Sequence, residues 1–188
     1  MAALLHDVGK SKGKKGHHKA SLELIKAHGT PLGWKTEDMQ RAAIVARFHC
    51  GALPTRSHKT LRDLLPNEQK ITIQLAAILR LANALDVSHD GHIRRVQVEA
   101  GNSTRTAPPN CVILSAEGYT ARSDTARAVA AERHLLETLL RRPVLIRPMN
   151  TAPRVSGRTP SRRNAKSEAR SHSVTFHRSA VRGTTERS

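Results

Sequence analysis

Apolar residues recur three or four positions apart through most of residues 1–90, which is the period of an amphipathic α-helix. The pattern is clearest over residues 42–49 and 71–86, where alanine, leucine, isoleucine and valine form a continuous stripe. Proline, glycine and asparagine residues interrupt it at 31–33, 51–54 and 66–67. We therefore expect helices over residues 1–8, about 18–28, 36–49 and 68–86.

The pattern changes after residue 86. Residues 92–99 and 111–117 are alternating or β-branched stretches joined by a loop rich in Gly, Asn, Ser and Pro, as in paired strands. Residues 124–140 show helical periodicity again, and 143–148 form a short apolar strand. The sequence thus predicts a mainly α fold, with a helical module over 1–90 and a small β-β-α-β module over 91–148.

The last segment, residues 149–188, has almost no apolar periodicity and is rich in Ser, Thr, Arg and Pro. It carries nine basic residues and two acidic ones. Such a segment buries too little apolar surface to offset the entropy lost on ordering, so we expect a disordered tail. The tail is either simply solvated or binds nucleic acid without sequence specificity, because it has basic side chains but no interleaved aromatic ones for stacking on bases.

Composition argues against all-β, disulfide-rich and membrane proteins. The 188 residues carry 32 Lys and Arg against 15 Asp and Glu, a formal net charge of +17, and aromatic residues make up only 2%. Few aromatics argue against a β-sandwich or barrel. Two cysteines, Cys50 and Cys111, cannot form a disulfide framework, so we expect a reducing, cytoplasmic setting. No apolar run approaches the ~20 residues that span a bilayer, and the first ten residues lack a signal-peptide pattern, so no membrane association is expected.

Several metal-ligand residues fall at the ends of predicted helices. His6 and Asp7 adjoin each other near the end of the first helix, and a neighbouring imidazole and carboxylate are suited to a divalent ion such as Mn, Mg, Fe or Zn. Asn83 and Asp86 share one helix face, since residues three apart are neighbours on a helix. Helices that converge on one point with such ligands can build a phosphohydrolase site, in which the metal activates water and offsets charge on a phosphoryl group. The candidate ligands are His6, Asp7, His17, His18, His49, Asn83 and Asp86.

A run of lysines lies between Asp7 and the second predicted helix, and it begins with Lys10 and ends with Lys19. These two lysines are candidates for binding phosphate, because clustered positive charge attracts polyanions toward a nearby site. A solvated basic loop is the alternative. His89, Asp90 and His92 form a polar turn to which we assign no role.

Three segments in order resemble the HD-type domain at the carboxyl end of the exopolyphosphatase/guanosine pentaphosphate phosphohydrolase (Ppx/GppA) family. They are ALLHDVGKSKGKKGHHKASLELI at 3–25, IVARFHCGALP at 44–54 and LAAILRLANALDVSH at 75–89, and the resemblance extends through AERHLLETLLRRPVLIRP at 131–148. It implies an HD-domain-like helical module. It also implies a link to removal of terminal phosphates from polyphosphate or guanosine pentaphosphate. Family members carry their catalytic centre in an amino-terminal actin-like module whose glycine-rich strands this sequence does not contain, so no catalytic residue is assigned.

The resemblance also assigns the candidate ligands to family positions. His6 and Asp7 match the HD pair, His17 or alternatively His18 the histidine that opens the next helix, and His49 the histidine of the second segment. Asn83 stands where HD enzymes place an aspartate, with Asp86 one turn later. The first HD histidine comes from a helix that would precede Met1, so the resemblance suggests a shortened gene product, with the basic tail as translation beyond the usual stop.

Three hypotheses follow for function. The first is a metal-dependent hydrolase of phosphoanhydride bonds. The second is a non-catalytic module that binds polyphosphate or a guanosine nucleotide and pairs with itself as a homodimer or with a separate catalytic chain. The third is a truncated remnant without activity, whose exposed interface would make it aggregate.

Overall fold

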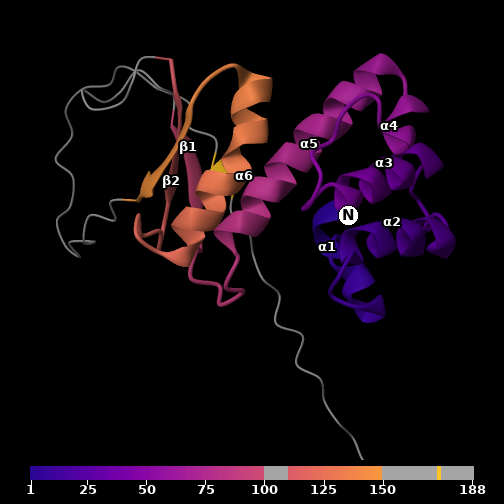
Figure 1. The fold of residues 1–188 in the computed structure, drawn as a ribbon, viewed down its shortest axis with the longest axis horizontal. Coiled ribbons are helices and arrows are strands. Elements are labelled where there is room, and N and C mark those ends of the chain that lie inside the picture. Colours follow the sequence, from indigo (N-terminus) through magenta and orange to yellow (C-terminus); the bar gives the residue numbers. More distant parts are fainter. Residues whose placement is uncertain (100–109, 150–172, 175–188) are drawn as a thin grey trace, which may run out of the picture.

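The computed structural model describes residues 1–99, 110–149 and the two-residue strand Ser173–Val174. Short helices come first in the chain, and one long helix follows them before a small sheet with a final helix (Figure 1). The helices are α1 (Ala2–Leu5), the 3-10 helix η1 (Val8–Lys12), α2 (His17–His28), α3 (Thr36–Arg47), α4 (Lys59–Arg62), α5 (Pro66–Leu85) and α6 (Asp124–Leu140). The strands are β1 (Val96–Glu99), β2 (Val112–Ala116), β3 (Val144–Pro148) and β4 (Ser173–Val174).

The predicted fold class is confirmed: helices come first and a β-β-α-β segment follows. The expected helix over residues 1–8 is divided, because α1 ends at Leu5 and the chain turns at His6–Asp7 before η1. Helix α5 begins at Pro66, which we had treated as a break. Proline is well suited to this position because its fixed φ matches the first helical turn, and Glu68 accepts the backbone N–H of Leu65 at 3.2 Å.

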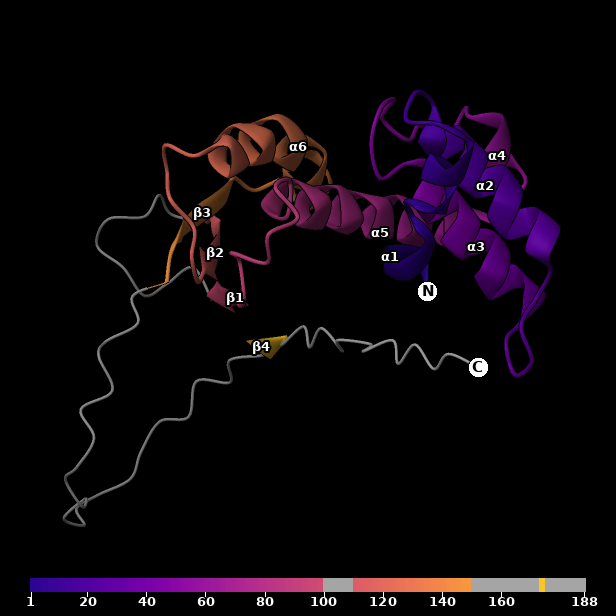
Figure 2. The ribbon, with the colours of Figure 1, turned by 90° about the horizontal axis from the view of Figure 1, so that it is seen from below.

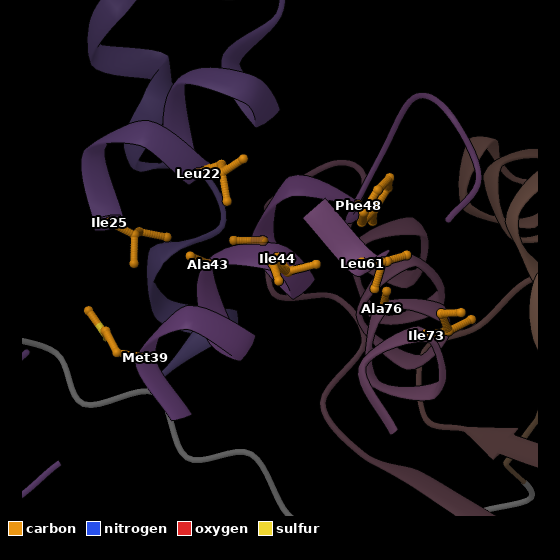
Figure 3. Packing of buried hydrophobic residues seen from close by; sticks show 10 residues of the cluster. Leu22, Ile25, Met39, Ala43, Ile44, Phe48, Leu61, Ile73 and Ala76 are labelled. Carbon is orange, nitrogen blue, oxygen red and sulfur yellow. The ribbon is translucent and has the colours of Figure 1, made fainter. Parts of the chain in front are cut away.

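A first apolar cluster joins α2, α3, α4 and α5. In Figure 3, Leu22 and Ile25 face the small side chain of Ala43, while Phe48 lies over Leu61 and Ala76. Small alanines on α3 and α5 let the helices approach closely, and the larger aliphatic side chains fill the remaining space. Burial of each leucine or isoleucine contributes about 1.5–3 kcal/mol. The cluster contains Leu22, Ile25, Met39, Ala43, Ile44, Ala46, Phe48, Leu61, Ile73 and Ala76.

A second apolar cluster lies between the sheet, α6 and the last turns of α5. The strand order is β3-β2-β1-β4, with β1 antiparallel to β2 and β2 parallel to β3. Helix α6 provides the crossover that a parallel pair requires. Leu81, Ala84 and Leu85 of α5 pack in this cluster with Val129 of α6 and Val144 of β3. Helix α5 therefore belongs to both clusters, and Figure 2 shows it running from the helices α1–α4 to the sheet and α6.

Part of the sequence prediction lies outside the described residues. The predicted disorder of 149–188 concerns residues that the structure does not describe, apart from Met149 and the strand β4, whose Ser173–Val174 backbone pairs with β1. The proposed domain boundaries at residues 90 and 148 stay a prediction. Within the described ranges, no helix is long and apolar enough to cross a membrane.

Candidate metal centre

Four side chains from three neighbouring segments meet beside the amino end of α2. His6 and Asp7 stand on the turn after α1, His17 is the first residue of α2, and His49 follows the last turn of α3. We call this group the His–Asp cluster. Its members come from positions up to 43 residues apart in sequence, by 49 minus 6, so packing of α1, α2 and α3 has to bring them together.

The turn that carries His6 and Asp7 is fixed on α2 by Gly9 and Ser21. The Gly9 N–H donates to the Ser21 hydroxyl at 2.9 Å, and that hydroxyl donates to the His6 carbonyl at 2.7 Å. A Cβ on Gly9 would lie 2.0 Å from the His17 carbonyl oxygen and 2.5 Å from the Ser21 nitrogen. Only glycine allows this approach, so Gly9 holds η1 and the preceding turn close to α2.

The distances within the cluster suit ligands of a single ion. The Nε2 atoms of His17 and His49 lie 3.0 Å apart, and Asp7 Oδ1 lies 3.3 Å from the first and 3.4 Å from the second. At a metal–ligand distance of about 2.1 Å, adjacent ligands lie about 3.0 Å apart at right angles and about 3.4 Å apart at a tetrahedral angle. His6 Nε2 lies 3.5 Å from the other carboxylate oxygen of Asp7.

The second ring nitrogen of each histidine contacts a backbone carbonyl. Nδ1 lies 2.8 Å from the Ala3 oxygen in His6, 2.9 Å from the Lys14 oxygen in His17 and 2.7 Å from the Ala46 oxygen in His49. Because a carbonyl only accepts, each Nδ1 carries the hydrogen, and each neutral ring presents a lone pair at Nε2. Two such lone pairs at 3.0 Å require a proton or a cation between them, so the donor set fits a divalent metal ion.

Burial and charge keep these groups in the protonation states that bind metals. His49 is 2% exposed, and burial lowers its pKa to about 4 against the weaker opposing effect of the Ala46 hydrogen bond. Burial of Asp7 opposes its ionisation, but the hydrogen bond from Lys10 and the nearby His6 outweigh this and lower its pKa below the usual range. A neutral imidazole and an ionised carboxylate result.

Arg80 fixes the backbone around His49, and the sequence analysis missed it. The side chain is 4% exposed, and its guanidinium donates to the Phe48 carbonyl at 3.1 Å and to the Gly51 carbonyl at 3.0 Å. Its Nε donates to Glu132 on α6 at 2.7 Å. The signal was present, because a single arginine interrupts the apolar stretch of 71–86, and a buried arginine needs a counter-ion and carbonyl acceptors.

Cys50 is a further residue that the sequence analysis did not connect with metal. Its Sγ lies 3.7 Å from His17 Nε2, and with His17 and His49 it forms one group of potential ligands, beside a second group of His6, Asp7 and His49. Burial raises the pKa of the Cys50 thiol. Its position directly after His49 was the available signal.

Comparison with protein families places most of the chain in a known family. The family model described as Ppx/GppA phosphatase, domain III, matches residues 1–126. The chain belongs to the Ppx/GppA phosphatase family. No curated protein sequence and no solved structure matches it. The matched range includes the whole His–Asp cluster together with Cys50 and Arg80, whereas Glu132 lies beyond it.

The other predicted ligands of this Ppx/GppA domain lie elsewhere. His18 packs edge-on against His17 with its ring near Gly51, and burial followed by the charge of Arg47 lowers its pKa. Asp86 is exposed at the end of α5, 3.5 Å from His89 Nδ1. Asn83 is half-buried on α5, and its side chain makes no hydrogen bond to any described residue.

The two predicted phosphate-binding lysines differ in their surroundings. Lys10 donates to Asp7 and is 45% exposed, so it borders the His–Asp cluster. Lys19 is exposed on the first turn of α2. Lys10 therefore contacts the cluster, whereas Lys19 lies on the exposed surface of the helix that carries His17.

Proposed function

We propose that Asp7, His17 and His49 hold a divalent metal ion at a phosphate-binding site of a Ppx/GppA phosphatase. The single observation that carries this proposal is the pair of Nε2 atoms 3.0 Å apart, with Asp7 Oδ1 within 3.4 Å of both and each Nδ1 held by a carbonyl. His6 supports the site from the same HD dipeptide. Family membership favours the phosphoanhydride bonds of polyphosphate or guanosine pentaphosphate as the substrate class.

The site has the charges that such a substrate requires. A divalent ion bound there would polarise a phosphoryl oxygen and offset the negative charge that develops on it. Lys10 donates a hydrogen bond to Asp7, and its side chain is 45% exposed. The neighbouring lysines of η1 and the following turn attract a polyanion toward the cluster. Those exposed lysines are Lys12, Lys14 and Lys15.

Metal analysis of the purified full chain tests the first part of this proposal. We expect near-stoichiometric Mn, Fe, Mg or Zn in the wild type and in a His28→Ala control, because His28 is exposed at the far end of α2. We expect loss of the ion in Asp7→Ala and His17→Ala proteins whose circular dichroism is unchanged. Equal absence of metal from all four proteins after incubation with each ion would overturn the proposal.

Phosphate release tests the second part. The metal-loaded wild type should release inorganic phosphate from polyphosphate or guanosine pentaphosphate, and the Asp7→Ala protein should not. Bound metal without release of phosphate from either substrate would exclude hydrolysis of these substrates by this chain. The metal result and the activity result are therefore separate outcomes.

A second candidate function is a non-catalytic polyanion-binding module that pairs with itself or with a separate catalytic chain. The observation that favours it is the exposed lysines beside the cluster in a chain of net charge +17. Binding through phosphate neutralisation weakens steeply with salt. Salt-sensitive polyphosphate binding without phosphate release supports this candidate, and salt-insensitive binding contradicts it. For either function we propose a cytoplasmic setting, which the free thiols Cys50 and Cys111 support.

A further inference from the structure

The thiol of Cys50 lies beside the imidazole of His17, the first residue of α2. Its Sγ is 3.7 Å from His17 Nε2, while that nitrogen lies 3.0 Å from His49 Nε2. His49 is almost completely buried, and potential ligand atoms of His17, Cys50, Asp7 and His6 lie near its ring. A sulfur atom and two imidazole nitrogens thus lie within 4.8 Å of one another.

The spacing agrees with ligation of one ion by sulfur and nitrogen. With Zn–S of about 2.3 Å and Zn–N of about 2.0–2.1 Å, a tetrahedral angle places sulfur and nitrogen about 3.6 Å apart. The observed separation of 3.7 Å matches this geometry. The Cys50 side chain is half-buried, and in the absence of metal His17 Nε2 lies close enough to its thiol to accept a sulfur hydrogen bond.

The backbone that carries Cys50 is held in place from two sides. Arg80 binds the carbonyls of Phe48 and Gly51, which bracket His49 and Cys50. Gly51 adopts φ +71°, and a Cβ there would lie 3.3 Å from the ring of His18. Both ligand-bearing residues are therefore presented to His17 by a rigid turn, as a metal site requires.

We propose that Cys50 binds the metal ion through its thiolate, beside His17 and His49, and that this gives the site a preference for Zn²⁺-like ions over Mg²⁺. The inference rests on the proposed metal site and adds a ligand and a metal class to it. On binding, the Cys50 S–H bond breaks, its proton passes to solvent, and the sulfur lone pair forms the bond to the ion without any change of oxidation state. A soft thiolate favours Zn²⁺, Co²⁺ and Fe²⁺, whereas Mg²⁺ prefers oxygen ligands.

Substitution with Co²⁺ tests this ligand directly. The full-length protein loaded with Co²⁺ should show visible ligand-field bands and an intense near-ultraviolet band from thiolate-to-cobalt charge transfer. The near-ultraviolet band should disappear in Cys50→Ser and persist in the control Cys111→Ala, because the buried Cys111 stands directly before β2 and belongs to neither group of potential ligands. Zinc affinity, measured against a competing chelator, should fall about 10-fold or more in Cys50→Ser.

The outcomes separate the two proposals. Visible bands without the near-ultraviolet band in the wild type would overturn ligation by Cys50 and leave the metal site intact. Absence of all cobalt bands would overturn both.

A second measurement uses only the wild-type protein and so does not depend on the folding of a variant. Zn²⁺ should protect Cys50 from alkylation by iodoacetamide, as read by peptide mass spectrometry, and Mg²⁺ should not. Alkylation of Cys50 at the same rate with and without bound Zn²⁺ would overturn the inference.

Discussion

Arg80 of α5 and Glu132 of α6 form a partly buried ion pair with a 2.7 Å hydrogen bond, and the same guanidinium holds the turn that carries His49 and Cys50. The pair thus links the helix beside the sheet to the candidate metal centre. Glu132 is the only carboxylate among the described residues within salt-bridge distance of Arg80. The two halves of the described fold are therefore coupled by charge as well as by apolar packing.

Removal of either Arg80 or Glu132 should lower the free energy of unfolding. Glu132→Ala leaves the buried guanidinium of Arg80 without its partly exposed counter-ion, and loss of a hydrogen bond between charged groups costs about 1.5–3 kcal/mol. Urea unfolding of the full chain measures the loss. The exposed pair Arg127–Asp124 provides the control, since Arg127→Ala should change the free energy of unfolding by about 1 kcal/mol or less. Equal effects of the two substitutions on the free energy of unfolding would contradict the role assigned to the Arg80–Glu132 pair.

The contact of Gly9 with α2 leads to a second prediction. Gly9→Ala places a methyl group against the His17 carbonyl and Ser21, so the turn bearing His6 and Asp7 has to move. We expect metal affinity to fall about 10-fold or more, with a loss of stability of about 1–3 kcal/mol. Chelator competition and urea unfolding are the measurements. Lys12→Ala, in the same 3-10 helix but with an exposed side chain, is the control and should change neither quantity.

The shared helix α5 leads to a third prediction. Leu61 is fully buried in the first cluster and Val129 is 2% exposed in the second, and α5 belongs to both. Leu61→Ala, which should cost about 2–5 kcal/mol, and Val129→Ala, a smaller truncation, should each lower the midpoint of one common thermal transition. Leu32→Ala, at a fully exposed site, should leave the midpoint unchanged. Two separate transitions, each moved by one substitution only, would show that the proposed modules 1–90 and 91–148 unfold independently.

The sequence predicted the order of elements because amphipathic periodicity is a local property that packing preserves. It did not predict the positions where a distant contact decides the local structure. α1 ends at Leu5, and the next turn is held against α2 by the close approach of Gly9 to His17 and Ser21, a contact of which the helical pattern of residues 1–8 carries no trace. Pro66 was ambiguous for a different reason, since proline both breaks helices and begins them.

The candidate site likewise contains residues that the sequence predicted and residues whose role depends on distant contacts. His6, Asp7, His17 and His49 were named from residue type and family position, and the structure brings them together. Arg80 and Cys50 were not named, because their importance depends on the carbonyls and imidazole that surround them in space. Asp86 was predicted as a ligand because it lies three positions after Asn83 on the same helix face. The structure places it at the exposed end of α5, and the spacing alone does not indicate whether that face is turned toward the cluster or toward solvent.

The protonation of His49 gives a last prediction, for the protein freed of metal by a chelator. Its pKa is about 4 in the folded chain, mainly because of burial, and about 6.5 when unfolded. A depressed folded-state pKa means that its stabilising contribution is fully present above pH 6.5 and is lost as the pH falls toward 4. Between pH 7.5 and 4.5 the free energy of unfolding should therefore fall by about 2–3 kcal/mol through this group.

Urea unfolding at the two pH values measures the fall in stability, and His49→Gln should remove most of it. His18, whose pKa is also lowered by burial, contributes in the same direction, so a smaller pH dependence should remain. His28→Gln, at an exposed position, should leave the pH dependence as in the wild type. A free energy of unfolding that is independent of pH over this interval would mean that His49 is solvated in the metal-free protein. The buried position of His49 in the His–Asp cluster would then be wrong for that state.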